Sequence, residues 1–96
     1  MKWTHRETNL CMYSTGYVCE HSYIEISSTR WSDHWWFTYY VNGGAVLHGS
    51  FNAQNLNEAE QIVVLKVREE LAWRAERYSK MLTNFDKELN ESENLL

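Results

Sequence analysis

The most informative segment of the sequence is residues 34–51, which read HWWFTYYVNGGAVLHGSF. Aromatic and β-branched residues fill His34 to Val41, a composition typical of strands. Asn42 and Gly43 follow, and both tolerate the positive φ angles that a type I′ turn requires. Ala45 to Phe51 is apolar again and would return beside the first strand. The segment therefore predicts an antiparallel hairpin.

Side chains alternate between the two faces of a strand, so the hairpin predicts two groups of residues. With the turn centred on 42–43 or 43–44, one face would carry Trp35, Phe37, Tyr39, Val41, Val46, His48 and Ser50. The other would carry Trp36, Thr38, Tyr40, Ala45, Leu47, Gly49 and Phe51. A sheet covered by one helix needs only one apolar face, yet both of these faces hold large aromatic residues.

Something is therefore expected to cover the second face of the hairpin. One alternative is that the N-terminal segment, with Trp3 and Trp31, folds over it. Another is that the face binds a partner, since exposed aromatic patches usually mark binding sites. A third is stacking of nucleic-acid bases. The predicted contact residues on the sheet are Trp35, Trp36, Tyr39 and Tyr40.

The residues before the hairpin are also rich in strand-forming types. Leu10 to Ser14 and Tyr17 to Ser27 are predicted strands, with a turn at Ser14-Thr15-Gly16 between them. Lys2 to Thr8 is a candidate edge strand. The predicted fold class is α+β, with an antiparallel sheet of three to four strands over residues 10–53 followed by one long C-terminal helix.

The second half of the chain is predicted to be helical over residues 57–89. Asn57 is the expected N-cap, with Glu60 three residues later reaching back to its amide. A kink near Asn84 is an alternative, in which Thr83 caps a separate short helix that folds back. Residues 90–96 are expected to fray.

This helix is longer than the sheet that it follows. A helix from Asn57 to Leu89 spans about 48 Å, whereas strands of this length reach only about 17–27 Å. Ala59, Val63, Val67 and Leu71 recur every fourth residue and are expected to pack on the sheet. Further on, spacings of four and three residues define what we call the heptad seam: Leu71, Ala75, Tyr78, Leu82, Phe85 and Leu89. Such a stripe favours a homodimer or docking in a partner's groove.

Composition limits the classes of function. The 96 residues are expected to form a single domain, and 44% of them are hydrophobic, which favours a folded chain. A net charge of −4 argues against broad binding of phosphate backbones. Residues 1–10 contain no apolar leader, and no apolar run is long enough to span a membrane. The expected location is the cytoplasm, or the host cytoplasm if the chain is phage-encoded.

The sequence contains few groups that point to chemistry. Cys11, Cys19 and His21, with His34 or His48, are weak candidates for a zinc site because their spacing departs from that of zinc knuckles. Cys19 and His21 are poorly spaced for a nucleophile pair, and no orienting acid accompanies them. No reaction and no cofactor are therefore expected.

Part of the chain resembles a known layout. Val41–Gly44, Gly49–Phe51 and Leu56–Ala59 resemble the strand, turn, strand and helix start of three-stranded-sheet-plus-helix DNA-binding domains, such as those of plant ethylene-response factors and phage integrase arms. The resemblance implies a sheet with a helix after it. Those domains read DNA through Arg and Lys on the sheet, whereas the corresponding strands here carry Trp, Tyr and Phe.

As a whole, the compact, acidic and aromatic-rich chain resembles small proteins of phages and mobile elements, anti-CRISPR and other anti-defence inhibitors among them. That resemblance implies a non-enzymatic binding protein that inhibits or modulates a host macromolecular complex by occupying a site on it. The expected partners are a host protein or nucleoprotein complex and a second copy of the chain. The alternative is a nucleic-acid-binding module that uses the aromatic sheet face.

Overall fold

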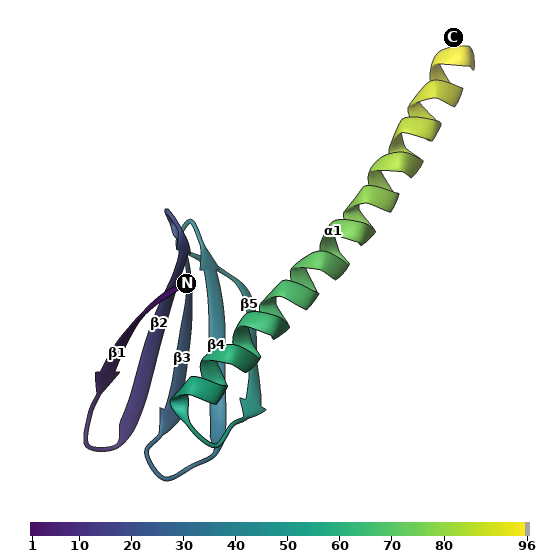
Figure 1. The fold of residues 1–96 in the computed structure, drawn as a ribbon. Helices are drawn as coiled ribbons and strands as arrows, with labels where there is room; N and C mark the ends of the chain where they lie inside the picture. The colour runs from purple at the N-terminus through teal and green to yellow at the C-terminus, as the bar shows by residue number, and fades with distance from the viewer. Residues whose placement is uncertain (96) are drawn as a thin grey trace.

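The computed structural model describes residues 1–95, with side chains placed as far as Glu91, and shows a five-stranded antiparallel sheet followed by one long helix (Figure 1). The strands are β1 (Lys2–Glu7), β2 (Cys11–Cys19), β3 (Ser22–Thr29), β4 (His34–Val41) and β5 (Gly44–Asn52), and the helix is α1 (Leu56–Leu95). The α+β prediction is confirmed. The predicted count of three to four strands is too low, because β1 joins the sheet as a full strand.

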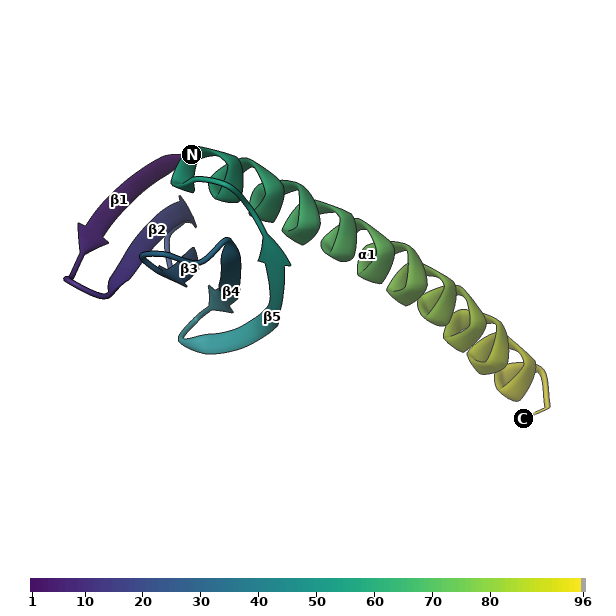
Figure 2. The same cartoon turned by 90° about the horizontal axis from the view of Figure 1, so that it is seen from below.

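The sheet is a simple meander in which every strand pairs with its neighbour in the chain, in the order β1-β2-β3-β4-β5. The helix lies on one side of the sheet only, as the view along the strands shows (Figure 2). The alternative in which the N-terminal segment folds over the second face is therefore wrong, because that segment is strand β1 within the sheet. Trp31 lies in the β3–β4 loop, where 82% of it is exposed.

The predicted turn at Ser14-Thr15-Gly16 is also wrong, because β2 runs straight through these residues. Gly16 pairs with Trp3 of β1, and a Cβ atom at Gly16 would lie 2.7 Å from the Trp3 ring. This glycine therefore permits a close approach of the indole and does not bend the chain. The turn comes later, where His21 adopts a φ of 62°.

The turn of the β4–β5 hairpin is confirmed, since Asn42 and Gly43 have φ angles of 52° and 81°. The predicted division of side chains between the faces is wrong for most of β5. A bulge shifts the register, so that Tyr40 pairs with Ala45 but Tyr39 pairs with Leu47. The extra residue, Val46, moves the rest of β5 to the opposite parity.

The bulge places the apolar residues of both strands on one face. Trp35 pairs with Phe51 and Tyr39 with Leu47, and all four side chains are buried. They form the core together with residues of β3, the β5–α1 link and the first half of the helix: Ile24, Ile26, Ala53, Ala59, Val63 and Val67. One face of the sheet thus receives all the buried apolar side chains, and the helix covers that face.

The helix begins earlier than predicted. The side chain of Asn55, and not that of Asn57, caps it, because its Oδ1 accepts a hydrogen bond of 2.9 Å from the backbone N–H of Glu58. This earlier start brings Leu56 against the core. It also leaves the Glu60 carboxylate free to bind the sheet, so Glu60 does not reach back to the cap.

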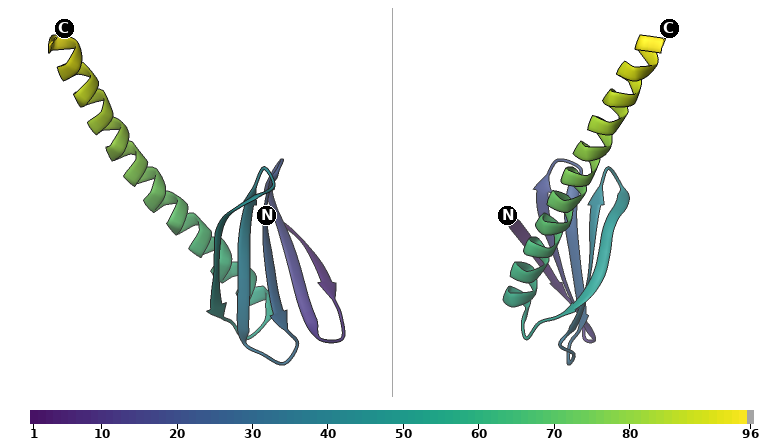
Figure 3. Two further views of the ribbon diagram at one scale, coloured as in Figure 1. Left: turned by 180° about the vertical axis from the view of Figure 1, so that it is seen from behind. Right: turned by 90° about the vertical axis from the view of Figure 1, so that its right-hand side faces the viewer.

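α1 continues without interruption through Asn84 to Leu95, so the alternative of a kink near Asn84 is wrong, and so is the predicted helix end at Leu89. Leu96 lies outside the described residues. Thr83 donates a hydrogen bond of 3.0 Å to the carbonyl of Ser79 within the helix and caps nothing. The projecting helix gives the molecule extents of 68 × 25 × 19 Å (Figure 3). Within residues 1–95, α1 lacks the uninterrupted apolar stretch that a membrane-spanning helix requires.

Candidate functional site

The side of the sheet away from α1, which we call the open face, carries two rows of aromatic residues. Strand register places Tyr17, Tyr23 and Tyr40 side by side across β2, β3 and β4. Four residues further along β3, a second row contains Tyr13 and Trp36 on either side of Ser27. The rows lie about 13 Å apart along the strands. A polar row with Glu25 at its centre separates them.

The aromatic rings of the open face contact one another directly. Tyr23 and Tyr40 stack with their ring centroids 4.9 Å apart, and Tyr17 lies 6.2 Å from Tyr23. The ring of Trp36 meets that of His34 edge-on at 4.6 Å. Such pairs hold rings in place. The open face is therefore a preorganised surface, and yet 56% of Tyr17 and 46% of Trp36 remain exposed.

Positive charge on the open face is confined to strand β1. The Arg6 guanidinium lies 4.7 Å from the centroid of the Tyr13 ring, a cation–π contact. Lys2 pairs with Tyr17 at the end of the other row. The Cys11 side chain beside Tyr13, through its hydrogen bond and its charge, raises the pKa of the Tyr13 phenol. Arg6 and Tyr13 also line a hollow of about 330 Å³ that reaches Glu25.

The structure divides the four sheet residues that the sequence suggested as contacts. Trp35 and Tyr39 lie in the core, where Trp35 donates a hydrogen bond of 3.0 Å to the carbonyl of Ala53. The Tyr39 hydroxyl accepts a bond of 2.7 Å from Ser22, which is also buried. Neither side chain is therefore available to a partner. Trp36 and Tyr40 lie on the open face.

Sequence reasoning missed the contribution of Tyr13, Tyr17 and Tyr23 to this surface. The three tyrosines share one face because β2 and β3 pair in one register from Cys11 to Tyr17, which places Tyr13 and Tyr17 on the same side and Tyr23 opposite Tyr17. The turn that was expected at residues 14–16 hid this pattern, because it assigned Tyr13 and Tyr17 to different strands. Alternation counted through Gly16 would have revealed it.

The second half of the helix forms another exposed surface. From Ala75 to Glu91 every residue is exposed, and the last helix residue buried against the sheet is Val67. The prediction that the helix outruns its sheet is therefore confirmed. Within the heptad seam, the exposed fraction rises from 37% at Leu71 to 67% at Phe85. Every member of the seam is thus exposed, and Tyr78, Leu82, Phe85 and Leu89 are each more than half exposed.

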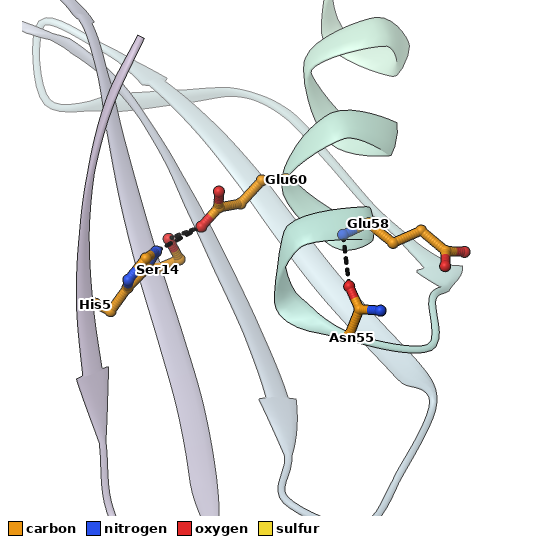
Figure 4. A network of polar contacts seen from close by, with 5 residues as sticks. All are labelled: His5, Ser14, Asn55, Glu58 and Glu60. Carbon is orange, nitrogen blue, oxygen red and sulfur yellow. Dashed lines mark hydrogen bonds and ion pairs between the residues drawn. The ribbon is translucent and has the colours of Figure 1, made fainter.

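A polar contact joins β1, β2 and α1 on the covered face (Figure 4). One oxygen of the Glu60 carboxylate contacts His5 Nε2 at 2.6 Å and accepts a hydrogen bond of 3.0 Å from the Ser14 hydroxyl. Serine, histidine and an acid lie together here, but the histidine does not lie between the other two. A nucleophilic triad needs the imidazole beside the serine hydroxyl. The contact therefore anchors the helix to the sheet.

The zinc hypothesis is not supported by the positions of its residues. Cys11 and Cys19 lie at opposite ends of β2, which places them about 26 Å apart along the strand. His21 lies in the turn beside Cys19, and its ring contacts Glu20 at 3.3 Å. Among residues 1–95, no group of three His, Cys, Asp or Glu side chains is close enough to bind a metal ion.

No protein-family model, curated protein or solved structure matches this chain.

Proposed function

We propose that the protein is a non-enzymatic binding protein that inhibits or modulates a macromolecular complex by docking on it through the open face. The observation that carries this proposal is the arrangement of Tyr13, Tyr17, Tyr23, Trp36 and Tyr40 in two rows on a sheet face that no element of residues 1–95 covers. These aromatic residues are not part of the hydrophobic core, because the core lies on the opposite face of the sheet, which α1 covers.

The chemistry of the open face suits a protein partner. Trp and Tyr are enriched where binding energy concentrates in protein interfaces, because they bury a large area and have few torsions to order. Here neighbouring strands hold the rings in place, which reduces the entropy that binding would cost. The polar row through Glu25 offers hydrogen-bond and charge partners between the two aromatic rows.

The resemblance to phage anti-defence proteins suggests the form that this activity takes. A small acidic chain that occupies a site on a host complex in the host cytoplasm needs a contact surface and no reaction chemistry. The net charge of −4 is compatible with a basic surface on the partner.

Binding of single-stranded nucleic acid to the same surface is the second candidate. Arg6 and Lys2 provide positive charge at one edge of the aromatic rows, as base-stacking platforms require. Glu25 at the centre of the face opposes that role, since it would lie close to the phosphate backbone.

A capture experiment with two double variants tests the proposed docking surface. The unchanged protein is expected to capture its partner from lysate of the cells in which the gene acts. The double variant Trp36→Ala/Tyr40→Ala is expected not to capture it. The matched control carries Trp31→Ala and Trp73→Ala, which remove indoles exposed by 82% and 54% away from the open face. Capture of the partner by the Trp36→Ala/Tyr40→Ala variant at the level of the control variant would show that binding does not use this surface.

Gel-shift assays with labelled single-stranded DNA and RNA distinguish the two candidates. A protein-binding surface is expected to give no shift at moderate salt. A shift that weakens steeply with salt and disappears in Trp36→Ala would favour the nucleic-acid alternative.

A further inference from the structure

We propose that the heptad seam binds the same seam of a second copy of the chain, and that the two helices run antiparallel. Leu71 of one protomer faces Leu89 of the partner subunit in this arrangement. The inference concerns α1 and does not depend on what the open face binds.

The seam has the geometry of one side of a two-helix coiled coil. Its members recur at spacings of four, three, four, three and four residues, which keeps them on one side of a helix. Tyr78, Leu82, Phe85 and Leu89 are each more than half exposed. The helix continues straight through them without support from the sheet. An apolar stripe of this length on a helix surrounded by water favours burial against another helix.

The sizes of the side chains along the seam favour antiparallel pairing. In an antiparallel pair that uses all six positions, Ala75 faces the partner's Phe85, and Tyr78 faces the partner's Leu82. The smallest side chain then meets the largest apolar one, which fills each layer evenly. A parallel pair would place Ala75 against the partner's Ala75 and Phe85 against the partner's Phe85. In that arrangement the alanine layer is underfilled and the phenylalanine layer is crowded.

Charges beside the seam favour the same orientation. On one flank of the stripe, successive heptads present Arg74, Met81 and Glu88. Antiparallel pairing brings Arg74 close to Glu88 of the partner subunit, and the twofold axis repeats this attraction. Met81 meets its own copy between the two ion pairs. In a parallel pair, Arg74 would lie beside the partner's Ser79 and gain no opposite charge.

The flanking Arg74 is available for such a contact. In one protomer it bonds Glu70 and the carbonyl of Val46, both at distances of 3.3 Å or more, and 36% of its side chain is exposed. These are long contacts at the edge of the sheet, so the guanidinium has further donors for a carboxylate.

Antiparallel pairing would place the two sheets at opposite ends of the dimer. Val63 of one protomer and Val63 of the partner subunit would be separated by roughly 34 residue rises, or about 51 Å along the helices. The assembly would present two copies of the open face and could bind two sites on one complex.

Site-specific cross-linking tests the orientation. In a background with Cys11→Ser and Cys19→Ser, the Arg74→Cys and Glu88→Cys variants are mixed, re-equilibrated and treated with a short bismaleimide. We expect a cross-link between positions 74 and 88 in the mixture and in neither variant alone. Ser79→Cys, which lies next to the twofold axis, is expected to cross-link to its own copy. A parallel pair would give neither product, because those positions would lie on opposite sides of the seam.

Charge exchange tests the register, with dimer dissociation measured by sedimentation equilibrium. Arg74→Glu and Glu88→Arg are each expected to raise the dissociation constant about tenfold, because each replaces two attractions with two repulsions. The two changes combined are expected to restore the constant to within about threefold. Recovery of the dissociation constant in the combined variant would show that Arg74 and Glu88 pair between protomers. Loss of the contact between Arg74 and Val46 alone would not be reversed by the change at Glu88. Additive weakening in the combined variant, or a monomeric unchanged protein, would overturn the proposal.

Discussion

The close contact between Gly16 and Trp3 is the tightest constraint at the scale of single residues. Any side chain at Gly16 would collide with the indole, and the Met1 sulfur lies 2.9 Å from the same point. The Trp3 ring in turn packs against the core. A glycine inside a strand can therefore be as specific a packing residue as the large side chain that it accommodates.

Replacement of this glycine tests the contact. Gly16→Ala is expected to lower the free energy of unfolding by about 1–3 kcal/mol, because the indole or the strand must move. Gly44→Ala is the matched control, since the nearest atom to its added methyl group is 3.7 Å away. Urea unfolding followed by tryptophan fluorescence measures both. A loss at Gly16 no larger than that at Gly44 would show that the ring is not tightly held.

At the scale of single residues, the sequence was informative where local chemistry alone sets the conformation. The turn at Asn42-Gly43 could be predicted because few other residue pairs adopt positive φ angles twice in succession. Gly16 was misread because the same residue type serves turns and close contacts. Only the tertiary partner, Trp3, distinguishes the two uses.

At the scale of secondary-structure elements, the helix start depends on a choice between two asparagines. Asn55 and Asn57 both precede an acidic residue by three positions, so either could begin a capping box. The earlier start gains the contact of Leu56 with the core, which local sequence cannot reveal. Tertiary packing therefore selected the cap.

Alanine substitution distinguishes the two asparagines. Asn55→Ala is expected to reduce the free energy of unfolding by about 1 kcal/mol, because the N–H of Glu58 loses its acceptor. Asn57→Ala is expected to change it by less than about 0.5 kcal/mol, as is usual for an exposed position. Thermal and urea unfolding measure both variants. Equal losses would mean that the helix start is shared between the two positions.

The β5 bulge is an element-scale feature that strand alternation could not predict. Without it, Leu47 and Phe51 would point to the opposite side from Trp35 and Tyr39. With it, all four meet in the core, and the energy of burying them outweighs one irregular pair in the ladder. The prediction of the candidate site was affected for the same reason. Without the bulge, Phe51 was assigned to the face of Trp36 and Tyr40, so both faces of the hairpin seemed equally aromatic.

The two halves of α1 are expected to be energetically separate. Removal of residues 75–96 deletes no side chain of the core, so the shortened chain is expected to keep its sheet. Its unfolding free energy, measured at a concentration too low for self-association, should differ by less than about 1 kcal/mol. Near-ultraviolet circular dichroism reports on the packing of Trp35. Collapse of that signal would show that the projecting half supports the core.

At the scale of the whole molecule, the fold leaves two surfaces without a partner in the described part of the chain. Only the first half of α1 covers the apolar face of the sheet, and Val67 is the last helix residue buried there. The second half of α1, which carries the heptad seam, projects away from the sheet that carries the open face (Figure 3). This separation would allow one surface to assemble the protein while the other engages a target.

The excess length of the helix could be predicted from residue counts alone, since rise per residue is fixed by backbone geometry. The use of that excess could not, because an exposed stripe is compatible with fold-back, a partner or a second copy. The continuous helix to Leu95 removes fold-back. The match of Ala75 to the partner's Phe85, with Arg74 beside the partner's Glu88, then favours a second copy.

The mass of the purified protein in solution, measured by light scattering coupled to size exclusion, tests this assembly most directly. The expected mass is about 23 kDa, twice the 11.5 kDa of one chain. The Leu82→Glu and Phe85→Glu variant should fall to 11.5 kDa with unchanged circular dichroism, while Trp73→Glu, off the seam, should stay dimeric. A mass of 11.5 kDa for the unchanged protein at tens of micromolar would contradict self-association through the seam.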